Sequence, residues 1–302
     1  MVQDIRTIGL SALRSFSTVA RLGGISAAAD RLGIAKSGVS RHVAQLESHF
    51  GVRLLERSAR SVKLTPFGER LQVRVASILA EVDLLDDIAR EESAGVSGQV
   101  SIAATPEFGG LVAATLFPTI TATHPDLKLV LRTAYAFEDM QDPGTDIAFR
   151  VGTFKDDRLV ARELGAFRAW IVASPKLPQV QDIRRPEDLE QVPCLVFRGN
   201  RTMTNWTLHA PGQQKSIAVS GPFGVQNFTI LLDLVLAGEG VGFLPEFMVS
   251  EAISNGTLIR CMPAYTSRPF PVFLTFRPGA RRIARLDAVI SLAEQQIPGL
   301  LN

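Results

Sequence analysis

The 302-residue sequence contains little cysteine and little histidine. Its two cysteines, Cys194 and Cys261, are 67 positions apart and form no CxxC pair, and the four histidines show no metal-ligand spacing. These absences argue against a structural zinc site, and we expect no metal and no other cofactor. Lone cysteines are usually small buried hydrophobic residues, so reduced thiols are expected, with a redox role as the less favoured alternative.

Membrane, secretion and catalytic signals are also missing. No apolar run approaches the eighteen residues that a membrane-spanning helix requires, and the N-terminal segment lacks the apolar core and cleavage site of a signal peptide. No GxSxG motif occurs, and the glycine-rich run 238–242 follows an expected helix and enters an expected strand, the reverse of a dinucleotide-binding loop. We therefore expect a cytoplasmic protein that is neither an enzyme nor membrane-bound.

The net charge of +2 is low for a nucleic-acid-binding protein, but the charge is unevenly distributed. Residues 1–74 hold twelve Lys/Arg and five Asp/Glu, a net charge of +7, whereas residues 75–95 carry −5 and the remainder is neutral. The positive charge therefore lies in the N-terminal quarter, as DNA binding requires.

Residues 25–64 predict two short helices separated by Gly33, which is suited to ending a helix sharply. Small and apolar residues occupy one face of the first helix: Ala27, Ala28, Ala29 and Leu32. The second helix has apolar residues on one side, namely Ile34, Val39, Val43, Leu46 and Phe50, and donors on the other, namely Lys36, Ser37, Ser40, Arg41, His42 and Gln45. This pattern fits a helix-turn-helix, although an ordinary solvated face explains it equally well.

The next residues favour the DNA-binding interpretation. Residues 52–64 alternate as a strand does and contain four cations, Arg53, Arg57, Arg60 and Lys63. A basic hairpin beside a recognition helix predicts a winged helix-turn-helix, in which the wing contacts phosphates.

A long helix is expected to follow, because Thr65 is a good N-cap and Pro66 suits the first helical position. Apolar residues then recur every three or four positions, at Leu71, Val75, Ile78, Val82, Leu85 and Ala89. This narrow heptad stripe predicts a dimerising helix over residues 66–93, and the alternative is an ordinary surface helix. The small residues and two glycines of 93–98 predict a hinge.

The rest of the chain predicts alternating strands and helices, and hence a parallel sheet. Strands are expected at 99–104, 127–133, 146–150, 159–164, 169–173, 195–197, 217–221, 241–244 and 271–276. Helices are expected from 105 to about 123, at 186–189, 229–237 and 246–255, and from 280 to 296.

The N-terminal residues resemble the DNA-binding domain of LysR-type transcriptional regulators. The matching positions are Leu13, Phe16, Val19, Ser26 to Ala29, Leu32, Gly33, Ser37, Val39 to Arg41, Leu46, Glu47, Gly51, Val52, Leu54, Leu55, Arg57, Leu64, Thr65 and Gly68. Ala35, Lys36 and Gly38 depart from the residues usual there, which bears on the operator sequence. The candidate DNA-binding residues are Ser26, Lys36, Ser37, Gly38, Ser40, Arg41, Arg53, Arg57 and Arg60.

The C-terminal region is similar, more loosely, to the effector domain of the same regulators. The motifs that carry this similarity are residues 146–152, 173–177 and 237–245. The resemblance implies a fold like that of periplasmic binding proteins, with two α/β lobes and a ligand cleft at two crossovers. It divides the chain into a winged helix-turn-helix (1–65), a dimerising helix with hinge (66–95) and an effector domain (96–302). Lobe one would comprise 96–163 with 267–302, and lobe two 164–266.

The expected cleft supplies candidate effector-binding residues. Thr105 places a hydroxyl at a helix N-terminus, which suits a carboxylate, although it would equally serve as a simple helix cap. From lobe two, Phe197 would stack on a ring and Arg198 would pair with an anion, while Asn227 precedes a helix. An arginine at a strand end is more often solvated, and Glu107 disfavours a nearby anion.

The sequence therefore predicts a homodimeric or homotetrameric regulator that binds an inverted-repeat operator in double-stranded DNA and a small effector, for which an anion is the candidate. The candidate dimerisation residues are Leu71, Val75, Ile78, Val82 and Leu85. The alternative is a small-molecule binding protein whose N-terminal domain contacts other proteins.

Overall fold

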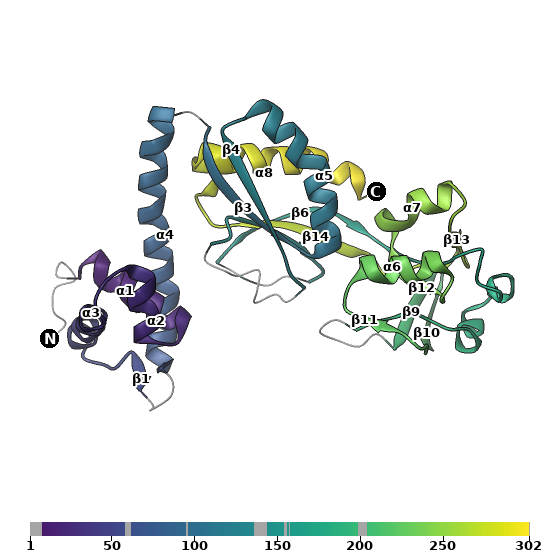
Figure 1. Cartoon of the computed structure of the whole chain (residues 1–302), viewed down its shortest axis with the longest axis horizontal. Coiled ribbons are helices and arrows are strands. Elements are labelled where there is room, and N and C mark those ends of the chain that lie inside the picture. Colours follow the sequence, from purple (N-terminus) through teal and green to yellow (C-terminus); the bar gives the residue numbers. More distant parts are fainter. Residues whose placement is uncertain are drawn as a thin grey trace. The chain divides into compact units, whose positions relative to one another are not determined.

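The structure of the chain, a computed structural model, describes residues 8–57, 62–94, 96–135, 144–153, 156, 158–198 and 204–301. The chain divides into two compact units, Met1–Ser93 and Ala94–Asn302 (Figure 1).

The first unit is a winged helix-turn-helix with a long C-terminal helix. Its elements are α1 (Leu10–Leu22), α2 (Ile25–Leu32), α3 (Lys36–Phe50), β1 (Leu55–Arg57), β2 (Val62–Leu64) and α4 (Pro66–Ala94). The strands pair in antiparallel fashion and form the expected hairpin. In Figure 1, α1, α2 and α3 lie beside the N-terminal half of α4, and the C-terminal half extends beyond them.

The core of this unit contains most of the residues that the helical periodicity predicted. Phe16, Val19, Val39, Val43 and Leu46 are all fully buried. Gly33 adopts the left-handed conformation and ends α2, as expected.

Two predicted inward residues are exposed, which corrects the sequence interpretation. Ala27 lies on the outer side of α2. Ile34 precedes α3 in the turn after Gly33, so the helical spacing does not carry its side chain inward, and it is 39% exposed.

The N-terminus of α4 forms as the sequence predicts. The Thr65 hydroxyl oxygen accepts a hydrogen bond from the Gly68 backbone N–H at 3.0 Å. Pro66 is the first residue of the helix, where its missing N–H costs no intrahelical bond. The structure therefore confirms the cap and the position of Pro66.

The apolar stripe of α4 divides into two parts. Val75 is buried in the core of its own unit, and Leu71 packs against the same core. Further along the helix, Ile78 is 47% exposed and Leu85 is 64% exposed, while Val82 is half-buried. Val75 therefore has little surface left for a second chain, and the free part of the stripe begins at Ile78.

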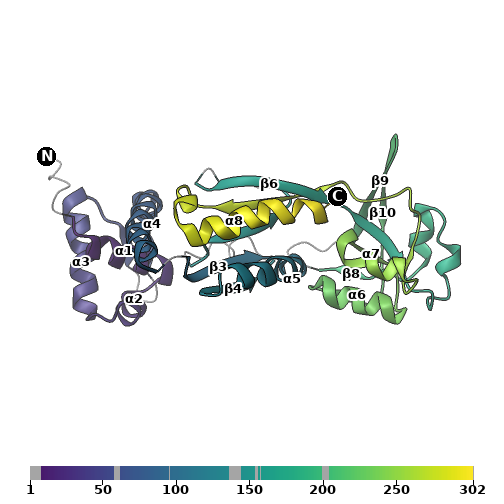
Figure 2. The same ribbon diagram turned by 90° about the horizontal axis from the view of Figure 1, so that it is seen from above.

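The second unit contains two lobes, and the first is built on a five-stranded sheet of order β4-β3-β5-β14-β6. The strands are β3 (Gly98–Ala104), β4 (Leu127–Thr133), β5 (Ile147–Val151), β6 (Val160–Phe167) and β14 (Phe270–Phe276). Helices α5 (Pro106–Thr123) and α8 (Ala284–Gln296) pack against each other and against β3 (Figure 2). The core between them includes Ile102, Phe149 and Val289, all fully buried.

The sheet of lobe one is mixed, so the expectation of a parallel sheet is only half confirmed. β3 is parallel to β4 and β5, whereas β14 is antiparallel to β5 and β6. β14 reaches this sheet from the second lobe and not through a helix crossover, so the rule that aligns βαβ strands does not set its direction.

The second lobe is made of shorter elements. Its strands are β7 (Ala169–Ala173), β8 (Val196–Phe197), β9 (Asn205–Ala210), β10 (Gln213–Ala218), β11 (Gly224–Val225), β12 (Gly242–Pro245) and β13 (Ile259–Arg260). Its helices are α6 (Phe228–Ala237), α7 (Glu246–Ser254), η3 (Val180–Asp182) and η4 (Pro186–Gln191), and η5 (Ala280–Arg282) and η6 (Pro298–Leu300) flank α8 in lobe one. The sequence interpretation missed β9, β11, β13, η3 and the break between η5 and α8, and it placed at 217–221 the strand that the structure has at Gln213–Ala218.

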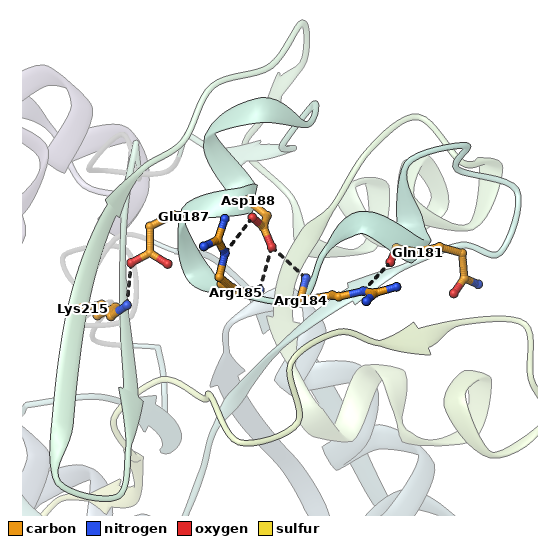
Figure 3. Close-up of polar contacts among 6 residues, drawn as sticks. All are labelled: Gln181, Arg184, Arg185, Glu187, Asp188 and Lys215. Atoms are coloured by element: carbon orange, nitrogen blue, oxygen red, sulfur yellow. Dashed lines mark hydrogen bonds and ion pairs between the residues drawn. The ribbon is translucent and has the colours of Figure 1, made fainter.

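The helical turn η4 is stabilised by side chains of its own sequence and of β10. Figure 3 shows Asp188 accepting hydrogen bonds from the backbone N–H groups of Arg184 and Arg185, at 3.0 and 2.8 Å. Lys215 on β10 forms an ion pair with Glu187 at 2.5 Å. The Arg185 N–H lowers the pKa of Asp188, and Lys215 lowers that of Glu187. This network joins η4 to the β9–β10 hairpin and lies outside both candidate sites.

The two lobes are joined by two crossing segments. β6 stays in the sheet of lobe one through Phe167, which pairs with Phe270, so lobe one extends four residues beyond the predicted boundary at 163. At the crossing, the Ser267 hydroxyl oxygen accepts a hydrogen bond from the Ala169 N–H at 2.8 Å, and Arg168 donates to the Ser267 carbonyl at 3.1 Å.

Candidate DNA-binding surface and interlobe site

Helix α3 presents polar side chains on the face opposite its apolar residues. Lys36, Ser37 and Arg41 are exposed, and Gly38 and Ser40 are half-buried. Ala35 occupies the N-cap and provides no side-chain hydrogen bond, so the first turn of the helix has no capping side chain. Cations beside free backbone N–H groups make this end of α3 suited to phosphate and base edges.

His42 has a different role from the one its sequence position suggested. Its Nδ1 lies 2.7 Å from the hydroxyl oxygen of Ser15, which is buried on α1. This hydrogen bond joins α3 to α1, so His42 faces the support helix and belongs to the scaffold of the surface.

The hairpin places part of the predicted wing. Arg53 is exposed two residues before β1, and Lys63 is exposed on β2. Arg57 ends β1, but its side chain lies outside the described part of the structure, and so does Arg60. On α2, Ser26 is exposed in the first turn.

In the second unit, Thr105 lies at the N-terminus of α5, where β3 ends. Its hydroxyl oxygen is buried and has no hydrogen-bond partner among the described residues. Thr105 occupies the N-cap of α5 as expected, but its side chain forms no cap hydrogen bond. A buried polar atom without a protein partner is costly, which makes the Thr105 hydroxyl a candidate for a hydrogen bond to a ligand or a water.

Tyr135, which follows β4, links the two lobes beside Thr105. Its hydroxyl donates to Glu107 in the first turn of α5 at 2.8 Å and accepts from the Phe228 N–H of α6 at 3.2 Å. Burial raises the pKa of Tyr135, and Glu107 adds to this effect while the Phe228 N–H opposes it. The hydroxyl is therefore protonated at neutral pH and serves as the donor to Glu107. Sequence reasoning missed this residue, although it is one of only two tyrosines in the chain.

Of the three residues predicted to contact an effector from lobe two, Arg198 and Asn227 contact their own lobe, whereas Phe197 also contacts Tyr135, with ring centroids 5.4 Å apart. One face of the Phe197 ring is stacked on Phe228, with centroids 4.1 Å apart. The exposed Arg198 side chain lies against Gly224 of β11. Asn227 caps α6, because its Oδ1 accepts from the N–H groups of Thr229 and Ile230 at 2.7 and 3.1 Å.

We call the group formed by Thr105, Glu107, Tyr135, Phe197 and Phe228 the interlobe site. Two helix N-termini, those of α5 and α6, meet at the Tyr135 hydroxyl. The N–H groups of Phe228, Thr229 and Ile230 in α6 already have acceptors, so the α5 terminus is the better position for a ligand oxygen.

Metal and membrane sites are not found in the described part of the chain. Its His, Cys, Asp and Glu residues form no group of three that would hold a metal ion. Among the same residues, no helix is long and apolar enough to cross a bilayer.

A winged helix-turn-helix followed by two α/β lobes with two crossings defines a class: DNA-binding regulators that carry a ligand-binding domain. The family model for bacterial regulatory helix-turn-helix proteins of the lysR family matches residues 10–69. The model for the LysR substrate binding domain matches residues 93–298. The chain therefore belongs to the LysR family of transcriptional regulators.

Individual relatives agree with this assignment. An uncharacterised helix-turn-helix regulator of Haemophilus influenzae is 28% identical, over 94% of this chain and 98% of its own. The regulator DmlR of Escherichia coli K12 is 30% identical, over 85% of this chain and 84% of its own. The solved structure of CrgA, a LysR-type regulator of Neisseria meningitidis, is 26% identical with a TM-score of 0.60, and covers 95% of this chain and 98% of its own.

The comparisons decide between the two functions that the sequence allowed. The chain is a DNA-binding transcription regulator with an effector-binding domain, and not a binding protein whose N-terminal domain contacts only proteins. The relatives are named as transcriptional regulators, which are not enzymes.

Proposed function

We propose that α3 inserts into the DNA major groove, with Lys36, Ser37, Ser40 and Arg41 facing the bases and phosphates. The exposure of Lys36, Ser37 and Arg41 supports this role, and the exposed Arg53 would bind a phosphate. The remaining candidate DNA-binding residues are Ser26, Gly38, Arg57 and Arg60. Two copies of the chain would read an inverted repeat with half-sites about one DNA turn apart, or a multiple of it.

The dimer would form through the outer part of α4. Exposed apolar side chains at Ile78 and Leu85, with half-buried Val82 between them, leave a stripe that a second copy would cover. Leu71 and Val75 support the helix from within their own unit. A tetramer would be a further assembly of such dimers.

We propose that the interlobe site binds a small effector through the α5 terminus. The observation that carries this proposal is the buried Thr105 hydroxyl oxygen with no partner among the described residues. A small carboxylate suits a hydroxyl beside helix N–H groups. Glu107 carries a like charge in the same turn, and its hydrogen bond from Tyr135 offsets part of that repulsion. Arg198 would attract the anion from the side of lobe two. The proposed function consists of binding DNA and an effector, so we propose no catalytic role for the chain.

A thermal-shift screen of the full chain tests this proposal. The panel should contain small aliphatic and aromatic carboxylates, each with its uncharged amide as a matched control. A carboxylate that stabilises the wild type and Thr105→Ser, but not Thr105→Ala, supports the site. A ligand whose effect is unchanged in both Thr105→Ala and Arg198→Ala would contradict it.

A further inference from the structure

Glu47 connects the recognition helix to the wing. It lies in the C-terminal half of α3, and its Oε1 accepts hydrogen bonds from the backbone N–H groups of Leu54 and Leu55, at 2.8 and 3.3 Å. Both leucine side chains are buried in the core of the unit. The carboxylate is therefore bound to the backbone at the point where the chain enters strand β1.

The same segment is held from its other side by the start of α4. The Thr65 N–H donates to the Leu54 carbonyl at 3.0 Å, and the Thr65 hydroxyl donates to the Arg53 carbonyl at 2.8 Å. Gly68 approaches the Leu54 carbonyl so closely that a Cβ at this position would collide with it. The backbone of residues 53–55 is thus fixed between α3 and α4, while the Arg53 side chain remains exposed.

Electrostatics make a carboxylate at this position unexpected. The first 74 residues carry a net charge of +7, and DNA phosphates repel any carboxylate on a helix that approaches them. Charge alone therefore disfavours Glu47 on a recognition helix. Its two backbone hydrogen bonds provide a reason for its presence, because the side chain is long enough for one oxygen to accept from both N–H groups.

We infer that Glu47 is a positioning residue, which fixes the backbone at the start of β1 relative to α3 so that Arg53 and the recognition helix contact the same DNA together. The inference rests on the proposed phosphate contact of Arg53. Glu47 itself touches no DNA in this account and acts through the backbone of Leu54 and Leu55.

Two substitutions separate the effect of the Glu47 side-chain length from the effect of its charge. Glu47→Gln removes the charge but keeps a carbonyl oxygen at the same distance. Glu47→Asp keeps the charge but shortens the side chain by one methylene. Arg53→Ala is the benchmark for removal of the proposed phosphate-binding side chain. Glu56→Gln controls for removal of a negative charge, because Glu56 is exposed on β1.

The measurement is the salt dependence of binding between the full chain and the DNA upstream of its own gene. Each phosphate that the protein binds contributes about 0.9 to the slope of log K against log salt. We expect the slope to fall by about 0.9 in both Arg53→Ala and Glu47→Asp, and to be unchanged in Glu47→Gln and Glu56→Gln. Amide exchange at Leu54 should rise in Glu47→Asp only.

The outcomes are distinguishable. If Arg53→Ala lowers the slope and a folded Glu47→Asp does not, the positioning role is wrong. If Arg53→Ala leaves the slope unchanged, the proposed phosphate contact of Arg53 is wrong, and so is the positioning role of Glu47 that rests on it. If Glu47→Asp does not fold, Glu47→Ala replaces it in the test. Alanine also lacks an oxygen that could accept from Leu54 and Leu55, and it favours helices more than Asp does.

Discussion

At the scale of single residues, the two helix N-termini of the interlobe site differ in how they are capped. The Asn227 side chain accepts hydrogen bonds from two backbone N–H groups of α6, whereas the Thr105 side chain accepts none from α5 and its hydroxyl oxygen is buried. The sequence pattern Thr-Pro-Glu predicts a cap, but it does not determine the side-chain rotamer. Candidate effector residues were therefore predictable by position, and their hydrogen bonds were not.

The different capping predicts different stabilities for two alanine variants. Asn227→Ala should lower the free energy of unfolding by about 1 kcal/mol, because a helix cap is removed. Thr105→Ala should leave it unchanged or raise it, because no protein hydrogen bond is broken and a buried hydroxyl without a partner is removed. Chemical denaturation of the full chain without ligand measures both. An equal decrease in the two variants would show that Thr105 acts as a cap after all.

The cysteines give a second prediction at this scale. Burial raises the pKa of Cys194 to about 12 and that of Cys261 to about 11, so the thiolate is scarce at neutral pH. In the folded chain, alkylation by iodoacetamide at pH 7.5 should be at least about a hundredfold slower than for a free cysteine. Both thiols should react once the chain is unfolded. A fast-reacting thiol in the folded chain would contradict the prediction and favour the redox alternative.

At the scale of elements, α4 shows why the heptad pattern was only partly informative. The spacing predicted one continuous dimer stripe, yet Val75 is buried against α1 to α3 of its own unit. Both uses of a helix face require the same period, so periodicity alone does not separate them. Only the position of the neighbouring helices shows which part of the stripe packs within its own unit.

This division predicts opposite effects for two variants of α4. Val75→Ala should lower the unfolding free energy of the first unit by roughly 2 kcal/mol, because it leaves a cavity in the core. Leu85→Asp should leave this stability almost unchanged and shift the assembly towards monomers. Thermal unfolding and analytical ultracentrifugation measure the two effects. Unchanged sedimentation of Leu85→Asp and of Ile78→Asp would exclude this stripe as the dimer interface.

The sheets were predictable in part, for physical reasons. Strands with buried, continuous apolar runs, such as β5, were found within one residue of their bounds. The hairpin strand β9 was missed, although Pro211 and Gly212 form a turn between two alternating segments. The direction of β14 depends on the crossing between lobes, which local sequence does not encode.

At the scale of the effector domain, the Tyr135 hydroxyl is one of the contacts that join its lobes. It is bonded to α5 in lobe one and to α6 in lobe two. An effector that binds at Thr105 acts beside this connection, so ligand binding and lobe arrangement are expected to be coupled there.

Tyr135→Phe should weaken the connection and keep the ring. The Phe228 N–H loses its acceptor, so its amide exchange should rise, while Thr229 and Ile230 remain protected by Asn227. Stability should fall by about 1 kcal/mol. Tyr265→Phe is the matched control, since Tyr265 packs within lobe two. Unchanged exchange at Phe228 would show that the hydroxyl does not join the lobes in solution.

The central claim is that α3 reads DNA, and a salt titration of DNA binding by variants of the full chain tests it most directly. The ligand should be the DNA upstream of the chain's own gene, and Arg184→Ala in lobe two serves as a matched control for removal of an exposed arginine. We predict that Arg41→Ala and Lys36→Ala weaken binding, with the salt slope falling by about 0.9 for each phosphate that the variant no longer binds, whereas Arg184→Ala binds as the wild type does. DNA affinity that is indifferent to both α3 substitutions would contradict the account.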